Sequence, residues 1–178
     1  NEQVTITIAP TPEDATVKLN GVVQKSVTVD YGTQVTYEVS KTGYVSKSGN
    51  IIADETQTLP VELVKQQVTL TIVPTPADAT VKIDGEVKSE VTVDYGTEIS
   101  YEVSKTGYVS KSGTVSAINT ETITIELVKQ KVTLTIAPTP EDAVVKINGI
   151  EQKTITVDYG TEVTYEVSKT GYVSKTAT

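Results

Sequence analysis

The stretch VTITIAPTPEDATVKLNG, residues 4–21, contains the pattern that decides the fold. Apolar residues alternate with polar ones over Val4–Ile8 and again over Ala15–Leu19. An apolar side chain at every second position predicts a strand with one buried and one exposed face. The pair Asn20-Gly21 follows, and such a pair tolerates the positive φ angles of a tight hairpin turn. The stretch therefore predicts two β-strands, the second of which enters a hairpin.

The sequence of 178 residues repeats this unit with a period of 64 residues. Val4, Val68 and Val132 start the three copies, and 36 of the 47 positions shared by the first and third copies are identical. We expect an all-β protein, a tandem array of small Ig-like β-sandwich modules with six or seven strands in each 64-residue repeat. The expected modules are 1–67, 68–131 and 132–178, the third lacking its last strand or strands.

Two features of the copies limit how each strand ends and how the modules join. Proline cannot donate to a ladder, so Pro10-Thr11-Pro12 and its copies are expected to end the first strand. The polar segment Lys65-Gln66-Gln67 joins the first copy to the second without a Gly/Ser-rich linker. We therefore expect a semi-rigid array.

The third copy has no counterpart of Ile51–Val64, because Thr178 aligns with Asn50. An all-β module without its last strands exposes unpaired backbone and part of its core. One interpretation is that the sequence stops inside a longer array of repeats. The other is donor-strand complementation, in which a segment of another chain completes the module and builds a head-to-tail filament.

The composition excludes most kinds of site chemistry. The chain has no Cys and no His, and all fifteen basic residues are Lys. It therefore lacks thiolate nucleophiles, imidazole bases, and nitrogen or sulfur ligands for zinc, copper or haem. The net charge of −8 is spread evenly over the copies, which argues against nucleic acid as a partner. No apolar run reaches the roughly 20 residues of a membrane helix. We expect no enzyme, no catalytic residue, no cofactor and no metal.

The segment TPEDATVKLNG, followed by a hairpin and YEVSKTGY, resembles the PEGA-type repeat. It is also similar to Ig-like stalk repeats of bacterial surface proteins and phage fibres. The resemblance covers nearly the whole chain, although Asp14 stands where the PEGA name has Gly, and Ala77 departs further in the second copy. It implies a β-sandwich spacer at a cell surface or on a phage virion, with no catalytic residue.

Tyrosine is the only aromatic residue, with nine copies. Tyr37, Tyr101 and Tyr165 share a strand face with apolar neighbours and are expected in the core. Tyr44, Tyr108 and Tyr172 follow a turn glycine and are expected to pack over the sandwich edge. Tyr31, Tyr95 and Tyr159 fall at a turn and are the candidate exposed contact residues, although aromatic side chains more often belong to cores.

Acidic and basic side chains are weaker candidates for a functional site, namely a calcium site or an isopeptide link. Glu13-Asp14, Asp30 and Asp54-Glu55 fall in expected loops, but calcium needs about six to eight oxygen ligands and no EF-hand-like loop is present. Lys18, Lys82 and Lys146 lie on the polar face of their strand, which favours a solvated surface over an isopeptide link.

The pattern therefore favours a structural function: a stalk segment of an extracellular or virion surface protein that projects a functional tip. One alternative is a subunit of a filament that assembles with other copies of itself through residues 132–178. Another is a multivalent adhesin that binds a glycan or a host surface protein through repeated tyrosine patches.

Overall fold

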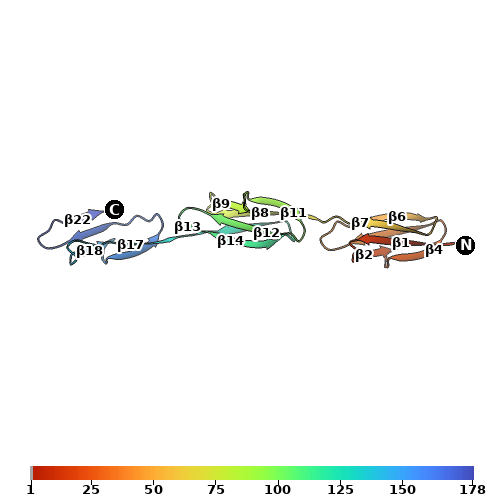
Figure 1. The fold of residues 1–178 in the computed structure, drawn as a ribbon, viewed down its shortest axis with the longest axis horizontal. Coiled ribbons are helices and arrows are strands. Elements are labelled where there is room, and N and C mark those ends of the chain that lie inside the picture. Colours follow the sequence, from red (N-terminus) through yellow and green to blue (C-terminus); the bar gives the residue numbers. More distant parts are fainter. Residues whose placement is uncertain (1) are drawn as a thin grey trace. The chain divides into compact units, whose positions relative to one another are not determined.

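The computed structural model describes residues 2–178, and every regular element in this range is a β-strand (Figure 1), which confirms the all-β prediction. This part of the chain contains no helix that is long and apolar enough to cross a membrane. The first copy has seven strands: β1 (Gln3–Thr11), β2 (Thr16–Leu19), β3 (Val22–Val23), β4 (Ser26–Asp30), β5 (Thr33–Ser40), β6 (Lys47–Ala53) and β7 (Gln57–Glu62).

The later copies repeat this order. The strands of the second copy are β8 (Gln67–Thr75), β9 (Thr80–Ile83), β10 (Glu86–Val87), β11 (Glu90–Asp94), β12 (Glu98–Ser104), β13 (Tyr108–Val109), β14 (Lys111–Ser116), β15 (Glu121–Glu126) and β16 (Val128–Lys129). Those of the third copy are β17 (Lys131–Thr135), β18 (Val144–Ile147), β19 (Ile150–Glu151), β20 (Thr154–Asp158), β21 (Tyr165–Ser168) and β22 (Lys175–Ala177).

The chain divides into two compact units whose boundary passes through the second copy. The first unit is Asn1–Thr71, Glu90–Ile99 and Thr114–Thr122. The second unit is Ile72–Ser89, Ser100–Gly113 and Ile123–Thr178. The first unit thus holds the first copy and the second unit holds the third, and each is described by itself below.

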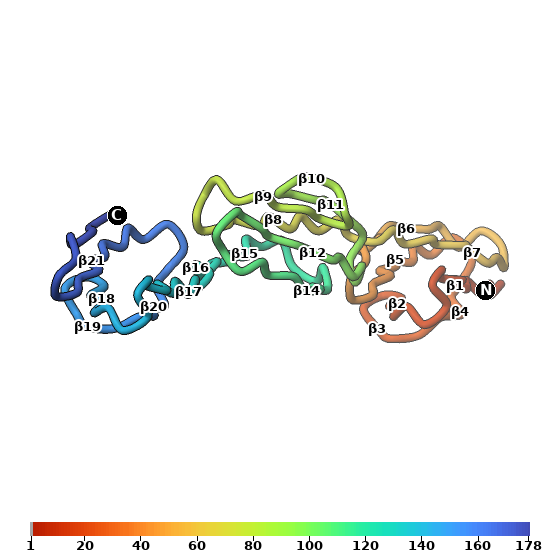
Figure 2. The backbone as a smooth tube through the Cα atoms, turned by 60° about the vertical axis from the view of Figure 1, so that its left-hand side comes forward, coloured from red at the N-terminus to blue at the C-terminus, as the bar shows by residue number. Residues whose placement is uncertain are grey.

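Two sheets build the first copy, with strand orders β4-β1-β7 and β3-β2-β5-β6 (Figure 2). The strand β1 lies in the middle of its sheet, antiparallel to β4 and parallel to β7. Side chains from both sheets form one core, because the apolar residues of each strand lie on a single face. Its buried members are Val4, Ile6, Ile8, Ala15, Val17, Leu19, Val35, Val39, Ala53, Val61 and Leu63.

The third copy has a smaller version of the same arrangement. Its sheets have the orders β17-β20 and β19-β18-β21-β22. The buried core cluster consists of Val145, Ile147 and Val163, with Tyr165 among the partly buried residues packed against it. The sheet of β17 therefore lacks the parallel neighbour that β7 provides in the first copy.

The hairpin turns agree with the sequence. Asn20 and Gly21 have φ angles of 48° and 81°, and the pairs Asp84-Gly85 and Asn148-Gly149 are alike. The side chain of Asn20 also accepts a hydrogen bond from the Thr36 backbone N–H, at 2.9 Å, so the turn is attached to the neighbouring strand β5. The turn residue thus sets both the hairpin and its contact with the sheet.

The first strand ends inside the segment Pro10-Thr11-Pro12, as expected, at Thr11. The strand β1 continues through Pro10 to Thr11, because β7 pairs with it that far. On its other side β4 pairs only as far as Thr7, so a proline beyond that point removes no ladder hydrogen bond there. The strand β8 likewise reaches Thr75, whereas β17 ends at Thr135.

Candidate functional site

The first copy contacts the second where a tyrosine ring covers a glycine. Gly43 is buried and has a φ of +80°, a conformation that L-residues with a side chain rarely adopt. A Cβ added at Gly43 would lie 2.8 Å from Cγ of Tyr95, so the ring lies directly against the glycine backbone. Both the backbone conformation and the lack of space therefore require glycine at this position.

The second copy contacts the third through the same pair of residues, one period later. Gly107 also has a φ of +80°, and a Cβ added there would lie 2.6 Å from Cε1 and 2.9 Å from Cγ of Tyr159. Each pair lies within one of the two compact units. We call these two places the joints: Gly43 with Tyr95, and Gly107 with Tyr159.

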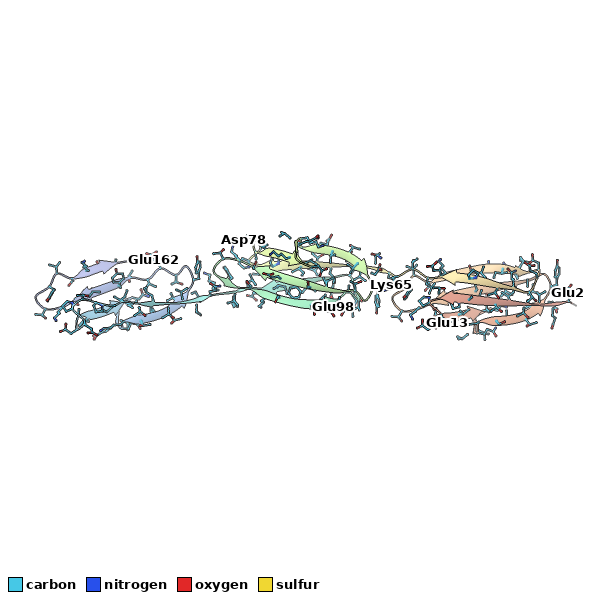
Figure 3. All side chains as sticks on the ribbon, viewed as in Figure 1. Glu2, Glu13, Lys65, Asp78, Glu98 and Glu162 are labelled. Atoms are coloured by element: carbon cyan, nitrogen blue, oxygen red, sulfur yellow. The ribbon has the colours of Figure 1, made fainter. Side chains whose placement is uncertain are left out.

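The segments that connect the copies are hydrogen-bonded into the joints. At the first joint the Gln66 N–H donates to the Gly43 carbonyl at 2.9 Å, and the Tyr95 N–H donates to the Gln66 carbonyl at 2.8 Å. Lys65 lies in the segment between β7 and β8 (Figure 3) and forms an antiparallel bridge with Tyr44. The connecting backbone therefore has partners on both sides, which limits its freedom.

The second joint repeats these hydrogen bonds. The Gln130 N–H donates to the Gly107 carbonyl at 2.9 Å, and the Tyr159 N–H donates to the Gln130 carbonyl at 2.8 Å. The side-chain Nε2 of Gln130 adds a bond of 3.1 Å to the Tyr108 carbonyl. Here the bridge extends to the short strands β13 and β16, which pair antiparallel. The two joints are thus built alike.

An ion pair anchors the turn that carries each of these glycines. Lys41 lies two residues before Gly43, and its Nζ donates to the Asp14 carboxylate in the loop after β1. This hydrogen bond is the largest cause that lowers the pKa of Asp14 below its ordinary value. Lys105 with Asp78, and Lys169 with Asp142, repeat the pair and lower the pKa of each aspartate in the same way. Because these carboxylates are largely exposed, the pairs contribute more to the placement of the turn than to stability.

Gly171 and Tyr31 are equivalent to the joint residues but do not form a joint with another residue of the described chain. None of the described residues comes within 4 Å of a Cβ built at Gly171, which has a φ of +84° and occupies the position of Gly43. Tyr31, which occupies the position of Tyr95 and Tyr159, covers no glycine of the described chain and is 59% exposed, whereas Tyr159 in its joint is 47% exposed. The joint is therefore a property of two adjacent copies and not of one copy alone.

The structure gives the candidate tyrosines different surroundings. Tyr95 and Tyr159 cover a glycine of the preceding copy, whereas Tyr31 has no such partner in the described chain. Their role as contacts for an external ligand stays a prediction. Tyr37 and Tyr44 pack against the core of the first copy, and Tyr172 is exposed.

The acidic candidates belong to different elements of the first copy. Asp14 is paired with Lys41, Asp30 is the last residue of β4, and Asp54-Glu55 lie between β6 and β7. Over residues 2–178, no three acidic side chains come together in a group that could hold a metal ion. Lys18 faces Glu38 across the strand pair at 3.9 Å, on the solvated side of the sheet.

The sequence pattern indicated turns at Gly43 and Gly107 but did not indicate the joints. The signal lay in the tyrosine of the following copy, which is 52 residues farther along the chain. Because the copies are nearly identical, every copy has this glycine and this tyrosine, and only the structure shows which of them meet.

The chain matches one family model three times. The model is described as Head fiber dimeric protein-like domain, and it matches residues 3–60, 67–127 and 131–178. The "Head fiber dimeric protein" of Bacteroides phage crAss001 is 49% identical over 51 residues, which cover 29% of this chain and 42% of that protein. The matched region thus spans less than half the length of this relative.

Two solved structures are similar at low sequence identity. "The Bacillus anthracis TIE protein" has a TM-score of 0.45 and 16% identity, and the match covers 98% of this chain and 47% of that chain. A Streptococcal ancillary pilin has a TM-score of 0.25 and 13% identity, and the match covers 99% of this chain and 96% of that chain.

The family match supports the phage-fibre part of the resemblance seen in the sequence, while the PEGA-type assignment stays a prediction. The three matched segments together cover most of the chain. The chain therefore belongs to the head fiber dimeric protein-like domain family.

Proposed function

We propose that this chain is a structural spacer segment of a phage head fibre. Its three modules, residues 1–67, 68–131 and 132–178, are joined into a semi-rigid array that holds a functional tip away from the virion surface. The observation that supports this function most directly is the pair of joints, in which a tyrosine covers a glycine and the connecting backbone is hydrogen-bonded. A spacer of this kind lengthens by copying one module together with its joint.

The joints account for stiffness in physical terms. A flexible linker gives neighbouring modules many orientations, whereas a connecting segment with hydrogen bonds on both sides has few. Gln66 and Gln130 each donate to the glycine carbonyl of one copy and accept from the tyrosine N–H of the next. The ring of Tyr95 or Tyr159 then fills the space over the glycine. Bending a joint would expose this ring surface and break these hydrogen bonds.

The proposal places the protein on the virion, outside cells, and involves no enzymatic step. The family and its phage relative are named for a head fibre, which is a structural part of a virion. The word "dimeric" in both names supports self-association of this chain. A second candidate is a subunit of a filament that assembles with other copies of itself, which the word "dimeric" in these names also supports.

Small-angle X-ray scattering of a monomeric fraction tests the spacer function. The first and second copies each contain a strand of nine residues, or about 30 Å, so three such modules in a row predict a maximum dimension of about 100 Å. We expect the double variant Tyr95→Ala/Tyr159→Ala to give a broader and shorter distribution of distances than the unmodified chain.

Tyr31→Ala is the matched control, because it removes the same side chain where no joint exists. It should scatter like the unmodified chain. If the double variant gives the same scattering as this control, the joints do not stiffen the array, and the proposed function loses its main support.

A further inference from the structure

The hairpin turn after the second strand of each copy begins with an asparagine in two copies and with an aspartate in the other. Asn20 and Asn148 stand before a glycine in the first and third copies, and Asp84 stands before a glycine in the second. Their φ angles are 48°, 51° and 50°, respectively. The same turn therefore accepts an amide or a carboxylate as its first residue.

The side-chain oxygen of each asparagine, and not its nitrogen, is hydrogen-bonded to one threonine. Asn20 Oδ1 accepts from the Thr36 N–H at 2.9 Å and from the Thr36 hydroxyl at 3.4 Å. Asn148 Oδ1 accepts from the Thr164 N–H at 3.0 Å and from the Thr164 hydroxyl at 3.2 Å. Neither Nδ2 has a hydrogen-bond partner among residues 2–178. The amide nitrogen thus contributes no such contact to the turn.

Asp84 shows that a carboxylate keeps these hydrogen bonds. Its Oδ1 accepts from the Ser100 N–H at 2.8 Å and from the Ser100 hydroxyl at 3.0 Å. Hydrogen bonds to an ionised acceptor are stronger than those to a neutral one. Replacement of the amide nitrogen by an oxygen at Asn20 or Asn148 therefore leaves the turn with all of its contacts.

Both asparagine–glycine pairs are open to water. Asn20, Gly21, Asn148 and Gly149 are all exposed. A Cβ built at Gly21 or Gly149 would have none of the described residues within 4 Å. Glycine also has no Cβ of its own beside its backbone nitrogen. This nitrogen is therefore little hindered as a nucleophile toward the side chain of the preceding asparagine.

An asparagine before a glycine loses ammonia in a reaction that needs only water and hydroxide. The glycine N–H gives its proton to hydroxide, and the nitrogen forms a bond with Cγ of the asparagine. The bond between Cγ and Nδ2 breaks, Nδ2 leaves as ammonia after taking a proton from water, and a succinimide ring remains. Water then opens this ring at either carbonyl carbon. The product is aspartate, or isoaspartate with an additional methylene in the main chain.

We propose that Asn20 and Asn148 are sites of spontaneous deamidation, and that the aspartate formed at each site is retained in the native hairpin turn. Each event adds one negative charge to an exposed turn. It gives the first or third copy the ionised turn that the second copy has as Asp84. This inference concerns the turns of single copies and goes beyond the spacer function, which does not depend on it.

The folded hairpin slows the reaction. Cγ of Asn20 reaches the Gly21 nitrogen only after the side chain leaves the Thr36 N–H, so the ring closes when the turn opens locally. When the turn closes again, aspartate takes the hydrogen bonds that Asp84 makes in the second copy. Isoaspartate disturbs the hairpin, because its longer main chain changes the register between β2 and β3.

Incubation of the full chain in mildly alkaline buffer tests the proposal. Isoelectric focusing should show two successive acidic shifts of one charge each. Cleavage after lysine releases residues 19–25 and 147–153, each of which contains one of the two asparagines. Mass spectrometry of these fragments should show that NH has been replaced by O. In urea, where the turn is not held, the same fragments should react at least about tenfold faster.

The chain supplies its own matched controls. Asn50 and Asn119 are also exposed, but each is followed by a β-branched residue, which hinders attack by the next backbone nitrogen. Fragments 48–65 and 112–129, which contain them, should stay unchanged over the same time. The variant Asn20→Asp/Asn148→Asp should give no acidic shift on incubation. Its amide NMR signals at Thr36 and Thr164 should keep the protection from hydrogen exchange that they have in the unmodified chain.

One group of results would overturn the assignment of the sites. These are unchanged fragments 19–25 and 147–153, equal reaction at Asn50 and Asn119, or an equal rate in the folded and urea-unfolded chain. Loss of exchange protection at Thr36 and Thr164 in the aspartate variant would overturn the retention of aspartate in the turn. None of these results bears on the scattering test of the spacer function.

Discussion

The substitution Gly107→Ala tests whether the ring of Tyr159 stabilises the closed form of the second joint. A Cβ at this position would lie 2.6 Å from Cε1 of the ring, so the ring has to move off the glycine. Tyr159 is 47% exposed and Tyr31, which has no joint, is 59% exposed. A tyrosine has about 200 Å² of accessible surface, so the difference of 12 percentage points in exposed fraction corresponds to about 25 Å² of buried area. This burial contributes about 0.6 kcal/mol to the closed joint. Losing it should open the joint about threefold more often.

Hydrogen exchange of the Gln130 amide measures this opening, because its N–H donates to the Gly107 carbonyl at 2.9 Å. The positive φ of alanine costs about 1–2 kcal/mol, but the open and closed joint both carry this cost as long as the turn stays folded. Gly171→Ala has the same backbone cost with free space around the Cβ, and so it is the matched control. It should leave the exchange of Gln130 unchanged.

The double variant Gly107→Ala/Tyr159→Ala, together with the two single variants, forms a double-mutant cycle. Once the ring is absent, the alanine should add nothing further to the exchange rate of Gln130, because the two substitutions remove the same contact. The reasoning would be refuted by an unchanged exchange rate in Gly107→Ala, or by equal acceleration in the presence and absence of the ring.

Two further predictions concern single copies. Hydrogen bonds from the Ser100 N–H and Oγ, at 2.8 and 3.0 Å, hold the pKa of Asp84 below its ordinary value. The ionised Asp84 therefore stabilises the folded state above its unfolded-state pKa, and this stabilisation is lost as pH falls through the lower folded-state pKa. The other two copies have Asn at this position. The variant Asp84→Asn should therefore make the thermal unfolding temperature less sensitive to acid between about pH 6 and pH 2. Leu70→Ala should lower the free energy of unfolding in urea by about 2–5 kcal/mol, since Leu70 is completely buried. Leu134→Ala, at the equivalent but partly exposed position of the third copy, should lower it by about 1 kcal/mol or less. Equal losses would contradict the exposed position of Leu134.

Much of the fold could be predicted because its signals are local. Alternation over Val4–Ile8 and Ala15–Leu19 assigns each side chain to a face of its strand, and the structure buries the expected face. Asn20-Gly21 sets a hairpin through its own backbone preferences, with φ angles of 48° and 81°. These features depend on residues next to one another in the sequence, so a pattern of a few residues is sufficient.

Strand ends were less predictable because a neighbouring strand decides them. The segment Pro10-Thr11-Pro12 was expected to end the first strand, and β1 does end in it, at Thr11, after pairing with β7 that far. The third copy has nearly the same sequence as the first, but β17 ends at Thr135. A strand persists where its ladder has a partner, and the partner comes from a distant part of the chain.

The joints show most clearly where local sequence stops being informative. Gly43, Gly107 and Gly171 stand in the identical segment SKTGYVSK and have nearly the same φ. Two of them are covered by a tyrosine of the next copy, and a Cβ at Gly171 would meet open space. The sequence by itself determined the strands, the hairpin turns and the repeat, since these follow from preferences within a few residues. Only the tertiary structure decided which tyrosine covers which glycine and which strand edge is open, because those contacts join residues about 50 positions apart.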